Sequence, residues 1–271
     1  MSDRVTVSIV DGVADVRLNR PDKLNAVDPA MFTALVDTGA QLAADPTVRC
    51  VVLSGEGRGF CAGLDFSSFQ AMAERPRSEP VDTGAADDVL DTGGRITSLG
   101  QQAAYAWTEM PAPVIAAVHG PAVGAGFQIA LAADLRIIAP DAKMSVLEIR
   151  WGLVPDMTGT QMLPRLVGLD VAKELTFTGR MVDGEECVRL GLATRLADDP
   201  RAAALEMARE IAAKSPQAIR RGKELLNLAG QVPLAEGFAA EARFMRELIG
   251  SPDQVEAVTA YFERRDPVFR G

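Results

Sequence analysis

Short apolar runs alternate with helical patterns along the first 200 residues, and this alternation constrains the fold more than any other feature of the chain. RCVVLSG (49–55), PVIAAVHG (113–120) and DLRIIAP (134–140) have the length and composition of buried strands. Before them, apolar and polar residues alternate on both sides of Asp11-Gly12, which predicts a hairpin. Asp28-Pro29 then supplies an N-cap and a first-turn proline for a helix. Strands separated by helices require crossover connections, so the pattern predicts an α/β core.

The chain becomes helical throughout after residue 200. Ser215-Pro216 and Ser251-Pro252 each combine an N-cap residue with a proline suited to the first turn. We therefore expect two parts, an α/β core in residues 1–200 and a helical region in residues 201–271.

Residues 70–98 differ from the rest of the core. They are polar and rich in Pro, Gly and Asp. Loops of this length are usually lids, binding loops or disordered segments. A mobile lid and an inert insertion are both compatible with this composition.

Charge and cysteine content exclude several classes of protein. A net charge of −9 opposes general binding to nucleic acid or to anionic membranes. Cys50, Cys61 and Cys187 are odd in number and widely spaced, which indicates neither a disulfide framework nor a zinc site. A reducing compartment fits this usage, so we expect a cytoplasmic protein. His119 is the only histidine, and neither a dinucleotide-binding nor a P-loop motif is present.

Two glycine-rich turns each follow a predicted strand. The first is GRGFCAGLD (57–65), and the second, HGPAVGAG (119–126), precedes an apolar helix. Glycine lets the backbone approach a ligand closely, and the first N–H groups of a helix have no partner within it. Two N–H groups aimed at one point would form an oxyanion hole. Tight strand–helix packing is the alternative, but two such turns upstream of paired acids favour the oxyanion hole.

The paired acids are Glu148 and Asp156 in LEIRWGLVPD (147–156), eight positions apart. If both face one apolar pocket, they form a candidate acid–base pair. If both are solvated surface charges, the stretch carries no chemical signal. The residue pattern alone leaves both interpretations open.

Six segments, in this order, resemble the crotonase superfamily, also called the enoyl-CoA hydratase/isomerase family. They are LNRPDKLNAV (18–27), GFCAGLD (59–65), AVHGPAVGAG (117–126), TGTQMLPRLVG (158–168), ELTFTGR (174–180) and YFERRDPVF (261–269). The resemblance implies an α/β crotonase fold of repeated ββα units with a C-terminal helical region that mediates trimers, which often pair into hexamers. It implies an acyl-CoA thioester as substrate and no metal or redox cofactor.

The resemblance also implies roles for individual residues. By position, the backbone N–H groups of Leu64 and Ala125 would bind the thioester oxygen. Family hydratases use two glutamates, and here Gln128 stands at the first position and Glu148 at the second. Glutamine cannot exchange a proton at neutral pH, so hydration by two glutamates is not expected.

The stretch 147–168 is similar to the dienoyl-CoA isomerases, which convert a 3,5-diene to a 2,4-diene with a Glu and an Asp at this spacing. We therefore predict Glu148 and Asp156 as the proton-transfer pair and Gln128 as an orienting residue, although the dienoyl-CoA isomerases carry Asp at the Gln128 position. An apolar wall around Trp151 would raise the pKa of one acid. A hydratase with a single glutamate and a non-catalytic acyl-CoA-binding protein are the alternatives.

The resemblance finally implies contacts to coenzyme A and substrate. The residues are Lys23, Leu24, Ala26, Ala62, Asp65, Phe66, Gly124 and Trp151. Arg20, Lys23, Arg58 and tail arginines such as Arg264 are candidates for the phosphates, and an ordinary solvated charge is the alternative for each of them.

Overall fold

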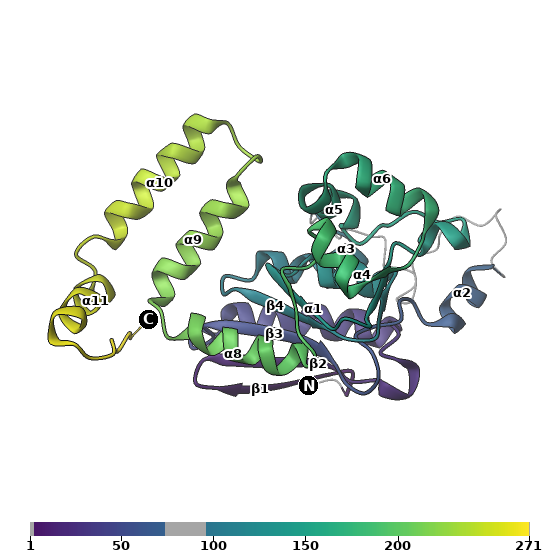
Figure 1. The fold of residues 1–271 in the computed structure, drawn as a ribbon, viewed down its shortest axis with the longest axis horizontal. Helices are drawn as coiled ribbons and strands as arrows, with labels where there is room; N and C mark the ends of the chain where they lie inside the picture. The colour runs from purple at the N-terminus through teal and green to yellow at the C-terminus, as the bar shows by residue number, and fades with distance from the viewer. Residues whose placement is uncertain (1–2, 74–95, 271) are drawn as a thin grey trace.

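The computed structural model describes residues 3–73 and 96–270, and its core is a six-stranded sheet (Figure 1). The strand order is β1-β2-β3-β4-β6-β9. The bounds are β1 Val5–Val10, β2 Val13–Leu18, β3 Cys50–Gly55, β4 Val114–Val118, β6 Leu135–Ile138 and β9 Arg195–Leu196. β1 and β2 are antiparallel and form the predicted hairpin, while the other neighbours are parallel. The three predicted buried strands are thus confirmed as β3, β4 and β6.

A second, three-stranded sheet lies beside the end of β4. Its order is β5-β7-β8, with bounds β5 Pro121–Val123, β7 Lys143–Ser145 and β8 Val182–Asp183. β5 belongs to the second glycine turn itself, so this small sheet holds that turn in place.

Helices cover both faces of the large sheet. Their bounds are α1 Pro29–Ala44, α2 Phe66–Ala73, α3 Leu99–Glu109, α4 Ala125–Leu131, α5 Gly159–Val167, α6 Leu169–Thr178, α7 Gly184–Leu190 and α8 Pro200–Ala212. Two short 3₁₀ helices, η1 Pro21–Lys23 and η2 Glu148–Trp151, connect them. The predicted cap at Asp28 is confirmed, since its side chain accepts from the N–H of Met31.

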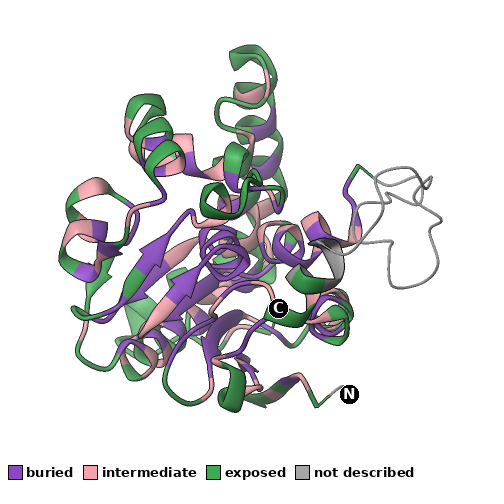
Figure 2. Cartoon of the chain, turned by 90° about the vertical axis from the view of Figure 1, so that its right-hand side faces the viewer, coloured by how far each residue is buried: buried purple, intermediate pink, exposed green. Residues whose placement is uncertain are grey.

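The alternation of side chains along β3 explains the layering. Cys50 and Val52 point to one face, where they pack with alanines of α8. Val51 and Leu53 point to the other face, where α1 and α3 supply Leu35 and other buried side chains. Because both faces are covered, the central strands are buried along their length (Figure 2).

The C-terminal arm, which we define as α9 Pro216–Leu228, α10 Leu234–Leu248 and α11 Pro252–Glu263, projects away from this core (Figure 1). Both predicted Ser-Pro starts are confirmed, because Ser215 and Ser251 accept from the N–H groups of Ala218 and Gln254. α8 packs on the sheet with the core elements, so the part that stands apart begins after α8, whereas the predicted division lies at residue 200.

A partly buried ion pair ties the arm to the core. The ammonium of Lys223 in α9 lies 2.7 Å from the carboxylate of Asp134 and donates to the carbonyl of Ala112 at 3.1 Å. No helix in the described ranges combines the length and apolar character needed to cross a bilayer. The predicted choice between lid and insertion for residues 70–98 falls mostly on residues 74–95, which lie outside the described ranges.

Candidate active site

The two glycine turns lie side by side. Cys61 in the first turn pairs with Ala122 in the second. The N–H of Cys61 donates to the carbonyl of Pro121 at 2.9 Å, and its carbonyl accepts from the N–H of Val123 at 3.1 Å. The fit requires glycine, because a Cβ on Gly126 would overlap the carbonyl oxygen of Cys61. A Cβ on Gly63, whose φ is +90°, would lie 2.9 Å from the carbonyl oxygen of Val123.

This pairing brings the N–H groups of Leu64 and Ala125 close together. Leu64 lies opposite Val27 in an isolated bridge, whose two hydrogen bonds are made by the carbonyl of Gly63 and the N–H of Asp65. The N–H of Leu64 therefore points away from Val27. Ala125 is the first residue of α4, where an N–H has no partner within the helix. Neither N–H donates to another group among the described residues. A Cβ on Gly63 would lie 3.8 Å from the nitrogen of Ala125. The turns thus leave two neighbouring N–H groups available to an oxyanion.

Glu148 stands beside the second turn. It is the first residue of η2, and its Oε1 would lie 3.6 Å from a Cβ on Gly124, the residue before Ala125. Oε1 accepts a 2.7 Å hydrogen bond from Nε2 of Gln128, while Oε2 is buried without a partner among the described residues. Burial raises the pKa of Glu148, and the charge of Asp156 raises it further.

Gln128 connects the two acids. It lies in α4 and is 1% exposed. Its Oε1 accepts from the backbone N–H groups of Met157 at 2.8 Å and Gly159 at 3.0 Å. A Cβ on Gly159 would lie 2.7 Å from that oxygen, so glycine is required there as well. One amide side chain therefore holds Glu148 and the loop that carries Asp156 in a common arrangement.

Asp156 occupies a more open position. The side chain is exposed, yet the surrounding protein removes enough water to raise the pKa of its carboxyl. It forms no ion pair with any described residue. Solvent reaches it through a cleft, whereas the protein walls on its other sides account for the raised pKa.

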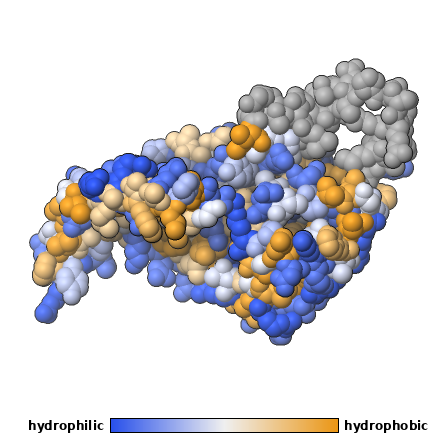
Figure 3. Space-filling model, turned by 90° about the horizontal axis from the view of Figure 1, so that it is seen from above, coloured by the Kyte–Doolittle hydropathy of each residue, from blue (hydrophilic) through white to orange (hydrophobic). Residues whose placement is uncertain are grey.

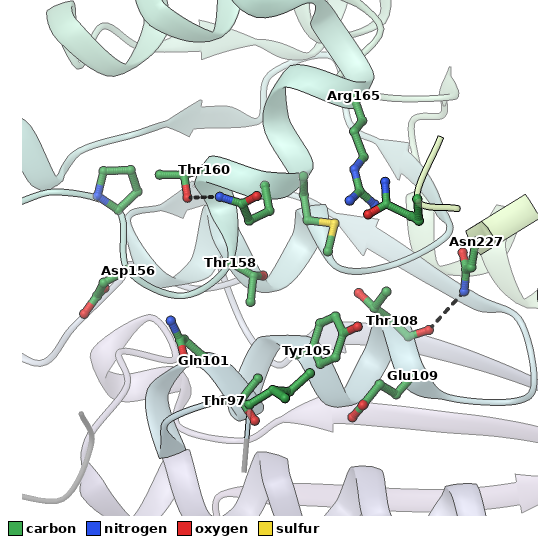
Figure 4. A pocket seen from close by; sticks show the side chains of 15 residues that line it. Thr97, Gln101, Tyr105, Thr108, Glu109, Asp156, Thr158, Thr160, Arg165 and Asn227 are labelled. Atoms are coloured by element: carbon green, nitrogen blue, oxygen red, sulfur yellow. Dashed lines mark hydrogen bonds between the residues drawn. The ribbon is translucent and has the colours of Figure 1, made fainter. Parts of the chain in front are cut away.

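The cleft has a volume of about 750 Å³ and lies between α3, the start of α5 and the end of α9 (Figure 4). Asp156 is at one end and Asn227 at the other (Figure 4). Its walls are mostly polar and consist of Ile96, Thr97, Gln101, Tyr105, Thr108, Glu109, Pro155, Asp156, Thr158, Thr160, Gln161, Met162, Arg165, Asn227 and Gln231. Neither Glu148 nor any residue of the two glycine turns lines it, so Asp156 is the acid that faces this cleft.

The predicted coenzyme A contacts include one strong structural pair. Asp65 accepts from the hydroxyl and N–H of Ser67 and from the guanidinium of Arg20, and these bonds lower the pKa of Asp65 to about 2. Arg20 also donates to the carbonyl of Ala26 at 3.0 Å. The pair braces the first turn against residues 20–26, so Arg20 has a structural role in addition to any contact with a phosphate.

The other predicted contacts are spread around the turns. Lys23 is exposed at the end of η1, Phe66 begins α2 and is 70% exposed, and Trp151 in η2 is 51% exposed. Arg264 caps α11, on the arm that projects away from the core (Figure 1). The structure thus places Glu148 beside the N–H groups of the turns, and it does not bring Arg264 to them.

Asn25 is a structural residue of the site that the sequence patterns did not single out. It is fully buried and has a φ of +58°, and its amide donates to the carbonyls of Glu56 and Gly59 at 2.9 Å. These bonds join residues 20–26 to the first turn. A polar residue within the apolar LNAV stretch is the signal that could have revealed it.

Comparison with known proteins gives consistent matches. The family model described as Enoyl-CoA hydratase/isomerase matches residues 8–271. The mitochondrial enoyl-CoA hydratase domain-containing protein 2 of Mus musculus is 36% identical over 267 residues, covering 96% of this chain and 85% of that protein. The (E)-benzylidenesuccinyl-CoA hydratase of Thauera aromatica is 33% identical over 270 residues, covering 98% and 99%. A crystal structure of an enoyl-CoA hydratase from Bacillus anthracis superimposes with a TM-score of 0.87 at 29% identity, covering 99% of each chain.

Proposed function

Since the chain belongs to the enoyl-CoA hydratase/isomerase family and has its crotonase fold, we propose that it is an isomerase that converts a 3,5-dienoyl-CoA to a 2,4-dienoyl-CoA. One observation carries the choice of reaction. The amide of Gln128 is already bonded to Glu148 and to the backbone of residues 157 and 159. Glu148 and Asp156 are then the acids left to move protons.

The proposed reaction begins at the carbon next to the thioester carbonyl. Glu148 removes a proton from C2, and the electrons move onto the carbonyl oxygen. The N–H groups of Leu64 and Ala125 stabilise that enolate, an effect that contributes roughly 3–4 kcal/mol per donor in a preorganised site. Asp156 then donates a proton to C6 while the double bonds shift from the 3,5 to the 2,4 positions. One proton leaves C2 and one reaches C6, so the substrate is isomerised without any metal or redox cofactor.

The positions of the two acids support this division of roles. Glu148 lies beside Gly124, next to one of the two donors proposed for the carbonyl oxygen, and so it would meet C2. Asp156 lines the cleft beyond the turns, and so it would meet the more distant carbon. The pKa of each acid is raised, which favours a pair that holds one proton between them, as transfer between two carbons requires. The exposure of Asp156 lets solvent restore the starting protonation state after each turnover.

Hydration with Glu148 as the only acid–base residue is the second candidate. The names of relatives favour it, since they include (E)-benzylidenesuccinyl-CoA hydratase of Thauera aromatica and methylglutaconyl-CoA hydratase of Mus musculus. Hydration adds water across a 2-enoyl thioester, which needs one base to activate the water and then a proton for C2. Glu148 alone could perform both steps.

A paired ultraviolet assay distinguishes the two reactions. One sample contains a 3,5-dienoyl-CoA, whose isomerisation creates an absorbing conjugated thioester, and the other contains a 2-enoyl-CoA, whose hydration removes absorbance. Isomerisation that is lost in Asp156→Asn supports the proposal. Hydration that survives Asp156→Asn and is lost in Glu148→Gln would favour the hydratase instead. A protein inactive in both assays that also fails to exchange the α-proton of bound acyl-CoA would be the non-catalytic binder.

We also propose that the C-terminal arm mediates a homotrimer, which could pair into a hexamer. Many large apolar side chains of the arm and the following tail are exposed, and Figure 3 shows apolar residues over this part of the molecule. They are Leu226, Leu234, Phe238, Met245, Ile249, Val255, Val258, Tyr261, Phe262 and Val268. Sedimentation of the wild type and of Phe238→Lys tests this. A monomeric wild type would contradict the trimer, and an intact trimer in the variant would contradict the role of the arm.

A cytoplasmic location stays a prediction, because the relatives include bacterial and mitochondrial proteins.

A further inference from the structure

We infer that Gln128 restricts proton transfer to one oxygen of Glu148, Oε2, and is thus a positioning residue of the reaction. This rests on the proposed function, in which Glu148 exchanges a proton with C2 of an acyl-CoA. It adds the identity of the reacting atom.

The orientation of the Gln128 amide is set by backbone groups that can only donate. The N–H groups of Met157 and Gly159 lie 2.8 and 3.0 Å from its Oε1. Turning the amide over would place its NH₂ group against these two donors, which would leave buried donors facing each other. The oxygen must therefore face residues 157 and 159, and the NH₂ group must face Glu148.

This orientation makes the two oxygens of Glu148 inequivalent. Oε1 faces an N–H donor at 2.7 Å and must act as an acceptor to keep that bond. A proton on Oε1 would point at a donor, so the protonated form of Glu148 carries its proton on Oε2. Oε2 is buried and has no partner among the described residues. A buried acceptor without a partner is destabilising, so its retention beside the glycine turns is explained if the substrate supplies the partner.

An acid at position 128 would remove this inequivalence. In Gln128→Glu, the introduced carboxyl would retain the two backbone bonds on one oxygen and place its other oxygen about 2.7 Å from Oε1 of Glu148. Two carboxyls at that distance do not both ionise readily, because their charges repel. They share one proton instead. Because the backbone N–H groups favour the ionised form of the introduced acid, the shared proton would sit on Oε1 of Glu148. Glu148 would then hold a proton at neutral pH on the oxygen that faces away from the substrate.

Infrared titration of the full-length protein without ligand tests the inference directly. The protonated carboxyl band of Glu148 is assigned by its loss in Glu148→Gln, and its titration is followed in wild type and in Gln128→Glu. We expect the Glu148 titration to move to higher pH by at least about one unit in Gln128→Glu, a tenfold change in proton affinity. Gln41→Glu, an exposed change in α1, controls for added charge and should leave the band unchanged.

Exchange of the α-protons of hexanoyl-CoA in heavy water provides the functional readout. We expect the exchange rate at neutral pH to fall about 100-fold in Gln128→Glu and its pH profile to move with the infrared titration. Gln128→Met, which is close in volume but lacks both polar groups, provides a second variant and should also slow exchange. An unchanged Glu148 titration and pH profile in both variants would overturn the inference. Wild-type protein that exchanges no α-protons would instead overturn the proposed function.

Discussion

The two acids of the site come from one ten-residue stretch, yet they have very different surroundings. Glu148 is partly buried beside the second glycine turn, and one of its oxygens is held by Gln128. Asp156 is exposed on the wall of a polar cleft and forms no ion pair with the described residues. In the proposed reaction, the partly buried acid that Gln128 holds acts at C2, which must be positioned closely. The open acid then serves the more distant carbon and exchanges protons with solvent.

Replacing the buried acid should have the largest effect. Glu148→Gln keeps the size of the side chain and removes its ability to take a proton, so we expect α-proton exchange and isomerisation both to fall by about 10³-fold. Exchange measured in heavy water and the ultraviolet assay report the two rates. Binding of acyl-CoA, measured by calorimetry, should change little and confirms that the variant is folded. A loss of less than about tenfold in exchange would remove Glu148 from its assigned role.

Replacing the open acid should separate the two steps. Asp156→Asn retains Glu148 and the N–H donors, so α-proton exchange should persist within about threefold, while conversion of the 3,5-diene falls by about 10²-fold. The same two assays on one preparation give this ratio. If both rates fall together, Asp156 acts on Glu148 rather than on the distant carbon, and the proposed division of roles is wrong.

A substitution where the two glycine turns pack together should reduce the stability of the protein. Gly126→Ala would place a methyl group on the carbonyl oxygen of Cys61, which separates the two glycine turns. We expect a loss of about 1–3 kcal/mol in the free energy of unfolding, measured with urea. Gly222→Ala is the matched control, because a Cβ there meets nothing within 4 Å and lies within α9. It should leave stability equal or slightly higher, since alanine favours the helix.

The sequence predicts the local elements of this site better than the hydrogen bonds that join them. The strands, caps and glycine turns depend on neighbouring residues, and the structure contains them as expected. The contacts of Gln128 depend on backbone groups about 30 positions away, which no periodic pattern encodes. The pairing of Arg20 with Asp65 likewise spans 45 positions, and no local pattern predicts it. Hydrogen bonds between distant segments are decided by packing, and so they appear only in the folded chain.

The pH dependence of stability should provide the finest comparison between the two acids. Both pKa values are raised in the folded protein, mainly by burial. A carboxyl with a raised pKa contributes stability that is complete below its ordinary pKa and is lost as the pH rises through the raised value. Glu148→Gln and Asp156→Asn each remove one such loss. Relative to wild type, both variants should therefore gain free energy of unfolding as the pH rises from about 4 to about 8.

The gain should be larger for Glu148→Gln than for Asp156→Asn. Glu148 is the less exposed of the two, and its pKa is raised additionally by the charge of Asp156, whereas solvent reaches Asp156 through the cleft. Urea unfolding of the three proteins across this pH range measures both gains. The double variant should gain less than the sum, because each single change already removes the repulsion between the two acids. Fully additive gains would mean that the two carboxylates do not interact. The charge of one would then have no influence on the protonation of the other during the reaction.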